Sequence, residues 1–195
     1  RIAELAYKAA MVRRKKLTLV DKANVLETSK LWRKRVIEIS KKYPKVSLNF
    51  LFVDNAAMQL ILNPTQFDVI LTDNMFGDIL SDEASVISGS IGLLASASIG
   101  EHSALFEPIH GSYYEAKGKN IANPLAAILS AAMLLDHFEL FVEAENIRNA
   151  VEKSIELSIT TPDLNDKNHF STTNVGNFIR DFKSLHYKCS TFTHK

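Results

Sequence analysis

The feature that most constrains this chain is the alternation of short apolar segments with helical segments over its first half. Residues 17–20, 46–53 and 67–71 have the continuous apolar character of buried strands, whereas residues 1–14, 27–42 and 55–62 have helical periodicity. Strands of this kind, separated by helices, are typical of α/β layering with some parallel pairing. The sequence therefore predicts an α/β fold.

Each of the three predicted strands is followed by polar residues. Lys22 follows the first strand, Asp54 follows the second, and the acidic segment 73–82 follows the third. Open α/β sheets bind ligands at the carboxyl ends of their strands, so the three groups are candidates for one site.

Asp78 and Asp82 lie four residues apart in a segment that is predicted to be helical. This spacing places both carboxylates on one face of a helix, where two like charges repel each other. A hard divalent cation such as Mg²⁺ or Mn²⁺ would remove the repulsion and prefers carboxylate oxygens. The pair is thus a candidate metal site; the alternative is two solvated acids on an exposed helix.

The second half of the chain has a different pattern. The segment 88–92 should end the helix that carries the two aspartates, and short extended pieces should follow as far as residue 109. Residues 110–120 form a polar loop, after which Asn123 should cap a helix with Pro124 at its first position. Further helices are predicted over 125–137, 140–157 and 173–185, followed by a loose tail.

Composition narrows the class of protein. The chain has 195 residues, of which 46% are hydrophobic and 23% charged, which suits one large domain or two small lobes. Its net charge of +1 produces no overall electrostatic field that would attract nucleic acid or an anionic membrane. The basic run 13–16 is explained by cations at a helix end, where they offset the helix dipole.

The single Cys189 fits a reducing compartment, and no apolar run reaches the ~18 residues of a membrane span, so we expect a cytoplasmic protein. Because the chain starts at Arg1, inside a helical pattern, we expect it to be a piece of a longer protein.

Five motifs together resemble a known family. They are VDKANVL at 20–26, VDNAAM at 53–58, NMFGDILSD at 74–82, FEPIHGS at 106–112 and GKNIANP at 118–124, with GSIG at 89–92 between the third and the fourth. From residue 1 to about residue 185 the chain is similar to the isopropylmalate dehydrogenases of the metal-dependent β-decarboxylating dehydrogenases, which include the isocitrate dehydrogenases.

The resemblance implies the α/β fold of that family, incomplete at the N-terminus. This fold is not a Rossmann fold, which agrees with the lack of a G-x-G-x-x-G motif. Residues 1–88 would be part of the dimerisation, substrate and metal domain, and residues 89–195 the C-terminal part of the cofactor-binding domain.

The resemblance also implies site residues. Lys22 and Asp54 would be catalytic and would contact the substrate, together with Asn24 and Val25. Asp54, Asp78 and Asp82 would surround Mg²⁺ or Mn²⁺, with Lys22 and Asp54 serving the active site of the other subunit of a homodimer. The NAD adenosine would be held by residues in and around the polar loop: Glu107, His110, Gly111, Ser112, Glu115 and Asn123. Without the resemblance, Lys22 would be a strand-end lysine, Asp54 a helix N-cap and His110 a hydrogen-bonded loop histidine.

The implied function is NAD-dependent oxidative decarboxylation of 3-isopropylmalate to 4-methyl-2-oxopentanoate in leucine biosynthesis. The carboxylate of Glu115 favours NAD because it would repel a 2′-phosphate, whereas Tyr113 and Tyr114, in place of small family residues, would reshape the adenosine pocket. The alternatives are an isocitrate or tartrate dehydrogenase, and an inactive dimerisation fragment or decayed copy.

Overall fold

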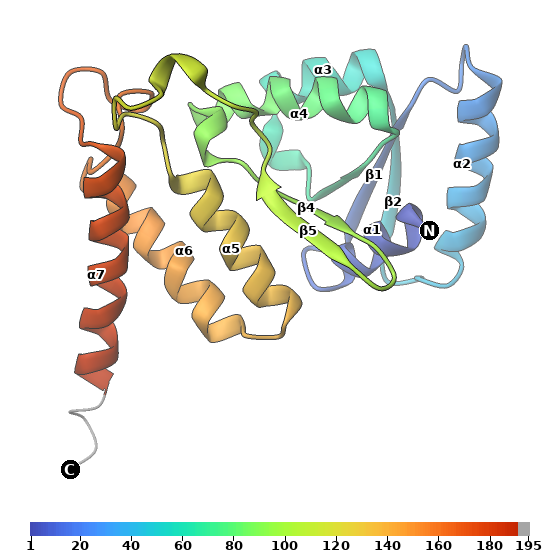
Figure 1. The fold of residues 1–195 in the computed structure, drawn as a ribbon. Coiled ribbons are helices and arrows are strands. Elements are labelled where there is room, and N and C mark those ends of the chain that lie inside the picture. Colours follow the sequence, from blue (N-terminus) through green and yellow to red (C-terminus); the bar gives the residue numbers. More distant parts are fainter. Residues whose placement is uncertain (191–195) are drawn as a thin grey trace. The chain divides into compact units, whose positions relative to one another are not determined.

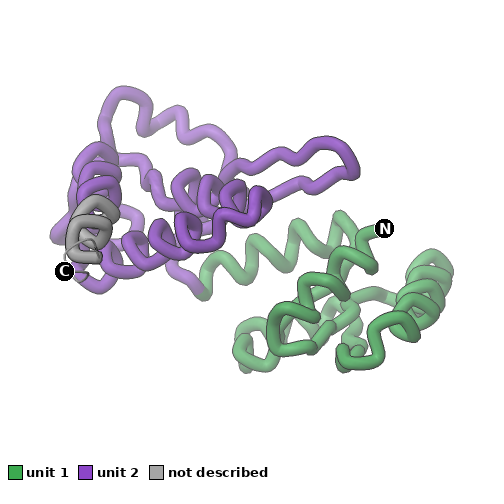
Figure 2. Tube along the Cα trace, turned by 90° about the horizontal axis from the view of Figure 1, so that it is seen from below, with its two compact units in different colours: residues 1–87 green, residues 88–195 purple. Residues whose placement is uncertain are grey.

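The structure is a computed structural model that describes the backbone of residues 1–190 and the side chains of residues 1–182. The chain forms two compact units, residues 1–87 and residues 88–195, which Figure 2 shows in green and purple. The division falls beside the boundary expected after residue 88, and the roles assigned to the two domains stay predictions.

The first unit contains a three-stranded parallel sheet. Strands β1 (Lys16–Asp21), β2 (Ser47–Phe52) and β3 (Val69–Leu71) are joined by helices, and β1 lies in the middle in the order β2-β1-β3. In the register, Leu19 pairs with Phe50 on one side and with Leu71 on the other. The helices are α1 (Ile2–Met11), α2 (Glu27–Ser40), α3 (Val53–Leu62) and α4 (Asn74–Ser88), so the predicted α/β layering and parallel pairing are confirmed (Figure 1).

Alternate residues of β1 build two separate cores, because successive side chains of a strand point to opposite faces of the sheet. Leu17 and Leu19 pack with Tyr7 of α1 and Val36 of α2. Val20 belongs to the other core, whose remaining buried residues are Ala56 and Leu60 of α3 and Leu80 of α4. Helices thus cover both faces of the sheet, which explains why β1 is almost entirely buried.

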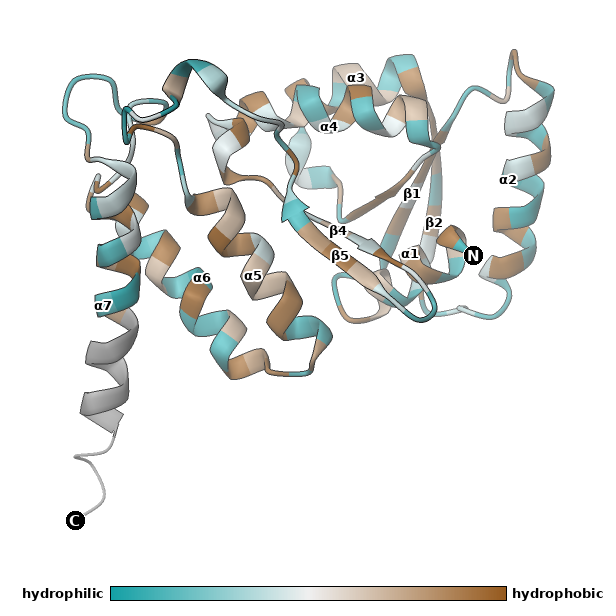
Figure 3. Cartoon of the chain, in the orientation of Figure 1, coloured by the Kyte–Doolittle hydropathy of each residue, from teal (hydrophilic) through white to brown (hydrophobic). Residues whose placement is uncertain are grey.

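The second unit combines an antiparallel hairpin with three helices. The hairpin consists of β4 (Ala95–Ile99) and β5 (Ala104–Pro108), and the helices are α5 (Leu125–His137), α6 (Phe141–Glu156) and α7 (Thr172–Ser190). Hydrophobic residues run along most of α5 (Figure 3), and Leu125 packs with Val151 of α6 and Val175 of α7 in the core of this unit. Three short 3₁₀ turns, Pro64–Gln66, Ile91–Leu93 and Tyr114–Ala116, complete the elements of the described residues.

Several boundaries differ from the sequence prediction by a few residues, two of them in the second unit. Helix α5 begins at Leu125, with Pro124 instead of Asn123 at the N-cap position, and the side chain of Asn123 accepts a hydrogen bond from the Leu125 N–H at 2.9 Å. Helix α7 continues past residue 185 to Ser190, so the start of the expected loose tail is helical, and residues 191–195 lie outside the described residues. Within the described residues, no helix has both the length and the apolar character that crossing a bilayer requires.

Candidate functional site

Lys22 and Asp54 meet at the carboxyl edge of the sheet in the first unit. Lys22 directly follows β1, and Asp54 lies in the first turn of α3, which begins immediately after β2. Because β1 and β2 are parallel neighbours, their ends bring the two side chains together, and the Lys22 Nζ donates to Asp54 Oδ1 at 2.7 Å. This hydrogen bond holds the pKa of Asp54 below its ordinary value. Asp54 is not the N-cap of α3, which is Phe52.

The backbone of Lys22 is held from both sides. Its N–H donates to Ser29 Oγ at 3.3 Å, and its carbonyl oxygen accepts from the N–H groups of Val25 and Leu26 at 3.0 and 2.8 Å. The turn that carries Lys22 is therefore fixed independently of its side chain.

The same turn is anchored by a buried ion pair. Asp21, whose side chain is fully buried, accepts from the Ala23 N–H at 2.9 Å and from Arg33 Nε and Nη2 at 2.7 and 2.6 Å. The Arg33 guanidinium also lies over the rings of Phe50 and Phe52, 5.0 and 5.3 Å from their centroids. Bidentate hydrogen bonds and aromatic faces both suit a planar guanidinium, so Arg33 ties α2 to the end of β1.

Asp78 and Asp82 both lie on α4, as expected, and both are exposed. None of the ion pairs among the described residues involves either carboxylate. Their spacing and oxygen ligands fit a hard divalent cation. Among the described residues, no three His, Cys, Asp or Glu side chains gather in a way that could hold a metal ion.

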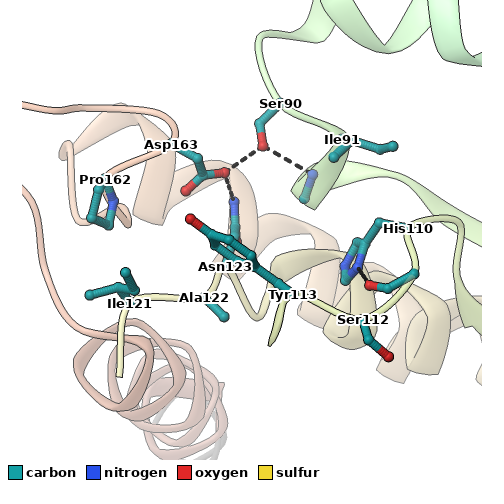
Figure 4. Close-up of a pocket in the computed structure, with 12 residues that line it drawn as sticks. Ser90, Ile91, His110, Ser112, Tyr113, Ile121, Ala122, Asn123, Pro162 and Asp163 are labelled. Atoms are coloured by element: carbon teal, nitrogen blue, oxygen red, sulfur yellow. Dashed lines mark hydrogen bonds between the residues drawn. The ribbon is translucent and has the colours of Figure 1, made fainter. Parts of the chain in front are cut away.

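The second unit contains a pocket of about 500 Å³. It is lined by residues 90–92, 110–113, 121–123 and 162–163, which Figure 4 shows converging from four separate segments. Its volume is in the range of small-molecule sites. No lysine or arginine lines it, and the one carboxylate in its wall is that of Asp163.

Asp163 connects three of these segments. Its Oδ2 accepts from the Ser90 hydroxyl and from Asn123 Nδ2, the latter at 2.8 Å, and its Oδ1 accepts from Thr161 Oγ1 at 2.6 Å (Figure 4). Burial raises the pKa of Asp163, but these three hydrogen bonds outweigh burial and hold that pKa below its ordinary value. The carboxylate therefore stays ionised near neutral pH and fixes the wall of the pocket.

The pocket contains four of the six residues that sequence reasoning assigned to a cofactor. His110, Gly111, Ser112 and Asn123 line it, whereas Glu107, on β5, and Glu115, in the 3₁₀ turn, do not. Nothing tests the assigned roles, which stay predictions. Sequence reasoning missed Ser90 and Asp163. Nothing in the sequence indicates that the segments of these two residues meet.

Gly92 allows the close approach of two pocket segments. A Cβ at this position would lie 2.8 Å from Cβ of Asn123, which is too close for any side chain to be accommodated without movement. Gly92→Ala should therefore displace Asn123 and lower the free energy of unfolding of the second unit by about 1–3 kcal/mol. Amide hydrogen exchange in α5 should become faster, while exchange in α2 of the first unit should not change.

The matched control for this prediction is Gly176→Ala in α7. A Cβ there meets nothing within 4 Å, and alanine favours the helix, so this variant should be at least as stable as the parent. If the two variants were equally stable, a Cβ at position 92 would not disturb the packing against Asn123.

Comparisons with known proteins identify the family. The family model described as "Isocitrate/isopropylmalate dehydrogenase" matches residues 1–179. The chain is 53% identical over 184 residues to a 3-isopropylmalate dehydrogenase of Bacteroides fragilis, covering 93% of this chain and 52% of that protein. It is 56% identical over 183 residues to a 3-isopropylmalate dehydrogenase of Clostridium pasteurianum, covering 92% of this chain and 51% of that protein. The chain thus spans about half the length of the curated relatives it matches.

The fold of the chain is also similar to that of a solved member of this family. The crystal structure of isocitrate dehydrogenase from Methylococcus capsulatus superposes with a TM-score of 0.87 at 39% identity, covering 93% of this chain and 56% of that chain. The resemblance of the sequence motifs, the family model and the superposition agree along nearly the whole chain. The chain belongs to the isocitrate/isopropylmalate dehydrogenase family.

Proposed function

We propose that this chain forms part of an NAD-dependent dehydrogenase that oxidises 3-isopropylmalate and decarboxylates the product to 4-methyl-2-oxopentanoate. The observation that carries the proposal is the identity of more than half of the aligned residues with proteins named 3-isopropylmalate dehydrogenase. The spatial pairing of Lys22 with Asp54 supports it. A cytoplasmic enzyme of leucine biosynthesis is the corresponding role.

In this proposal Lys22 removes the proton from the substrate hydroxyl as hydride leaves the adjoining carbon. Lys22 must enter this step as the neutral amine; the proton converts it to the ammonium, which Asp54 holds through the 2.7 Å hydrogen bond, and the fixed backbone of the turn aims the side chain. Asn24 and Val25 follow directly and would line the substrate pocket; Val25 is exposed and available for an alkyl group. Bound Mg²⁺ or Mn²⁺ would lower the pKa of the substrate hydroxyl and stabilise the enolate left by loss of CO₂, and NAD would accept the hydride.

Asp54, Asp78 and Asp82 would supply the carboxylates for the cation, with Asp54 coming from the other subunit of a homodimer. Two observations support this arrangement. No three candidate ligands gather among the described residues of one chain, and α3 and α4 expose several large apolar side chains: Met58, Ile61, Leu62, Met75, Ile79 and Val86. Exposed apolar surface of this kind is typical of interfaces between proteins.

The pocket of the second unit would hold the adenosine part of NAD. Its lining includes His110, Gly111, Ser112 and Asn123, and Glu107 and Glu115 would act from its surroundings. The absence of lysine and arginine from the lining and the carboxylate of Asp163 favour an adenosine without a 2′-phosphate.

Steady-state NADH formation by the whole protein tests the substrate. With Mn²⁺ present, kcat/KM for isopropylmalate should exceed that for isocitrate by at least about a hundredfold, because an alkyl pocket leaves the third carboxylate of isocitrate unpaired. The reverse preference would contradict the substrate assignment, and no turnover of either acid would favour an inactive copy.

The metal site has its own test in the same assay. Asp78→Asn should raise the metal concentration for half-maximal activity at least about tenfold, since one anionic ligand is lost from a hard-cation site. The control is Glu83→Gln, which removes an acid of the same helix outside the Asp78–Asp82 pair. Equal metal requirements of the two variants would remove Asp78 from the ligand set.

A further inference from the structure

Asn123 and Asp163, two polar side chains in the wall of the pocket, already have hydrogen-bond partners within the protein. Asn123 accepts from Leu125 N–H with Oδ1 and donates to Asp163 with Nδ2, and Asp163 accepts three hydrogen bonds in all. A ligand that competed for these groups would have to break hydrogen bonds within the protein, with little net gain. Hydrogen bonds from the side chains of Asn123 and Asp163 are therefore a weak source of affinity.

The rest of the wall is largely apolar. Ile91, Ile121 and Pro162 line the pocket together with the ring of Tyr113 (Figure 4). No lysine or arginine lines the pocket to attract a phosphate, and the largely apolar lining favours an uncharged group. A planar heteroaromatic ring suits such a space because it can bury both faces.

Two aromatic rings line the pocket: that of His110 contacts the carbonyl oxygen of Gly111 through Nδ1 at 3.0 Å, and the larger ring is that of Tyr113. Its side chain is 58% exposed, and among the described residues no hydrogen bond or ring contact engages the phenol. The ring can therefore adjust to a ligand without losing an existing partner. Tyr114, the next residue, is 79% exposed and does not line the pocket, so the two adjacent tyrosines differ in their access to a ligand.

We propose that Tyr113 is the residue on which the adenine ring of the bound cofactor stacks in this pocket. The inference rests on the proposed use of NAD, and it adds an aromatic contact that contributes most of the affinity of the adenosine part. Stacking of a base on an aromatic side chain is worth about 1–3 kcal/mol when measured by alanine substitution, which corresponds to about a five- to hundredfold change in affinity.

The test is the binding of NAD, adenosine and nicotinamide mononucleotide to the chain, measured by calorimetric titration. Tyr113→Ala should weaken the binding of NAD and of adenosine about five- to hundredfold, and Tyr113→Phe, which keeps the ring, should bind within about twofold of the parent. Tyr114→Ala is the matched control and should not change either affinity. Nicotinamide mononucleotide, which has no adenine, should not distinguish the variants.

A spectroscopic measurement separates stacking from a general effect on the fold. The adenine protons of bound NAD should shift upfield in proton NMR with the parent and with Tyr113→Phe, and this ring-current shift should shrink with Tyr113→Ala and with Tyr113→Leu. Unchanged or tighter binding by Tyr113→Ala would overturn the inference, and so would an equal loss in Tyr114→Ala. If the parent itself did not bind NAD, the proposed cofactor would fail first, which keeps the two outcomes distinct.

Discussion

Mixing two inactive variants of the whole protein should restore activity if one subunit supplies Lys22 and the other supplies Asp78 and Asp82. Lys22→Ala and Asp82→Asn should each abolish turnover alone, because every site of either homodimer is defective. In a mixed dimer one of the two sites has both parts intact. With random exchange at equal amounts, half of the dimers are mixed, so about a quarter of the parental activity should return.

The control for this experiment is a mixture of Lys22→Ala with Asp54→Asn. Both residues serve the site of the other subunit in the proposed arrangement, so each site of the mixed dimer lacks one of them and activity should stay absent. Recovery in this control, or no recovery in the first mixture when subunits demonstrably exchange, would contradict a site shared in this way.

Arg33→Ala should lower the free energy of unfolding of the first unit by about 3–5 kcal/mol, because it leaves the fully buried carboxylate of Asp21 without its cation. The measurement is urea unfolding followed by the fluorescence of Trp32, the only tryptophan of the chain, which packs against the core of this unit. Arg35→Ala is the matched control on the same helix. Arg35 is exposed and pairs with Glu38, so its loss should cost less than about 1 kcal/mol.

A double variant separates the charge from the packing. Arg33→Met combined with Asp21→Asn removes both charges and keeps most of the volume, so it should be more stable than Arg33→Met alone. If the double variant were less stable than Arg33→Met alone, the destabilisation would come from lost contacts with Phe50 and Phe52 instead of an unpaired charge.

The sequence predicted the elements and one part of the candidate site. Apolar periodicity correctly located the strands and helices, since it reflects the burial of one face of each element. The carboxyl-end rule placed Lys22 and Asp54 together because both follow parallel strands, and the structure confirms their contact. The position of β1 between β2 and β3 was not predicted, since periodicity contains no information on strand order.

The sequence could not predict which side chains pair between segments that are far apart along the chain. The basic run 13–16 had been explained by the dipole of a helix, yet α1 ends at Met11, and Arg13 pairs with the buried Asp68 at 2.9 Å. The hydrogen bonds that Asp163 accepts from Ser90 and Asn123 likewise join residues that are far apart along the chain. Such pairs depend on how the chain returns on itself, and a single sequence contains no local pattern for that.

The central position of β1 also governs the order in which the first unit can form. Both neighbours of β1 lie downstream of it, and β3 ends only at Leu71. While the chain is being synthesised, β1 has no partner strand until residues 47–52 have emerged, and its second edge stays open until residue 71 follows. Parallel pairing across such sequence distances is slow and exposes apolar strand edges in the meantime. Within the first unit, the edges of β1 therefore remain exposed to mispairing throughout the interval before Leu71 leaves the ribosome.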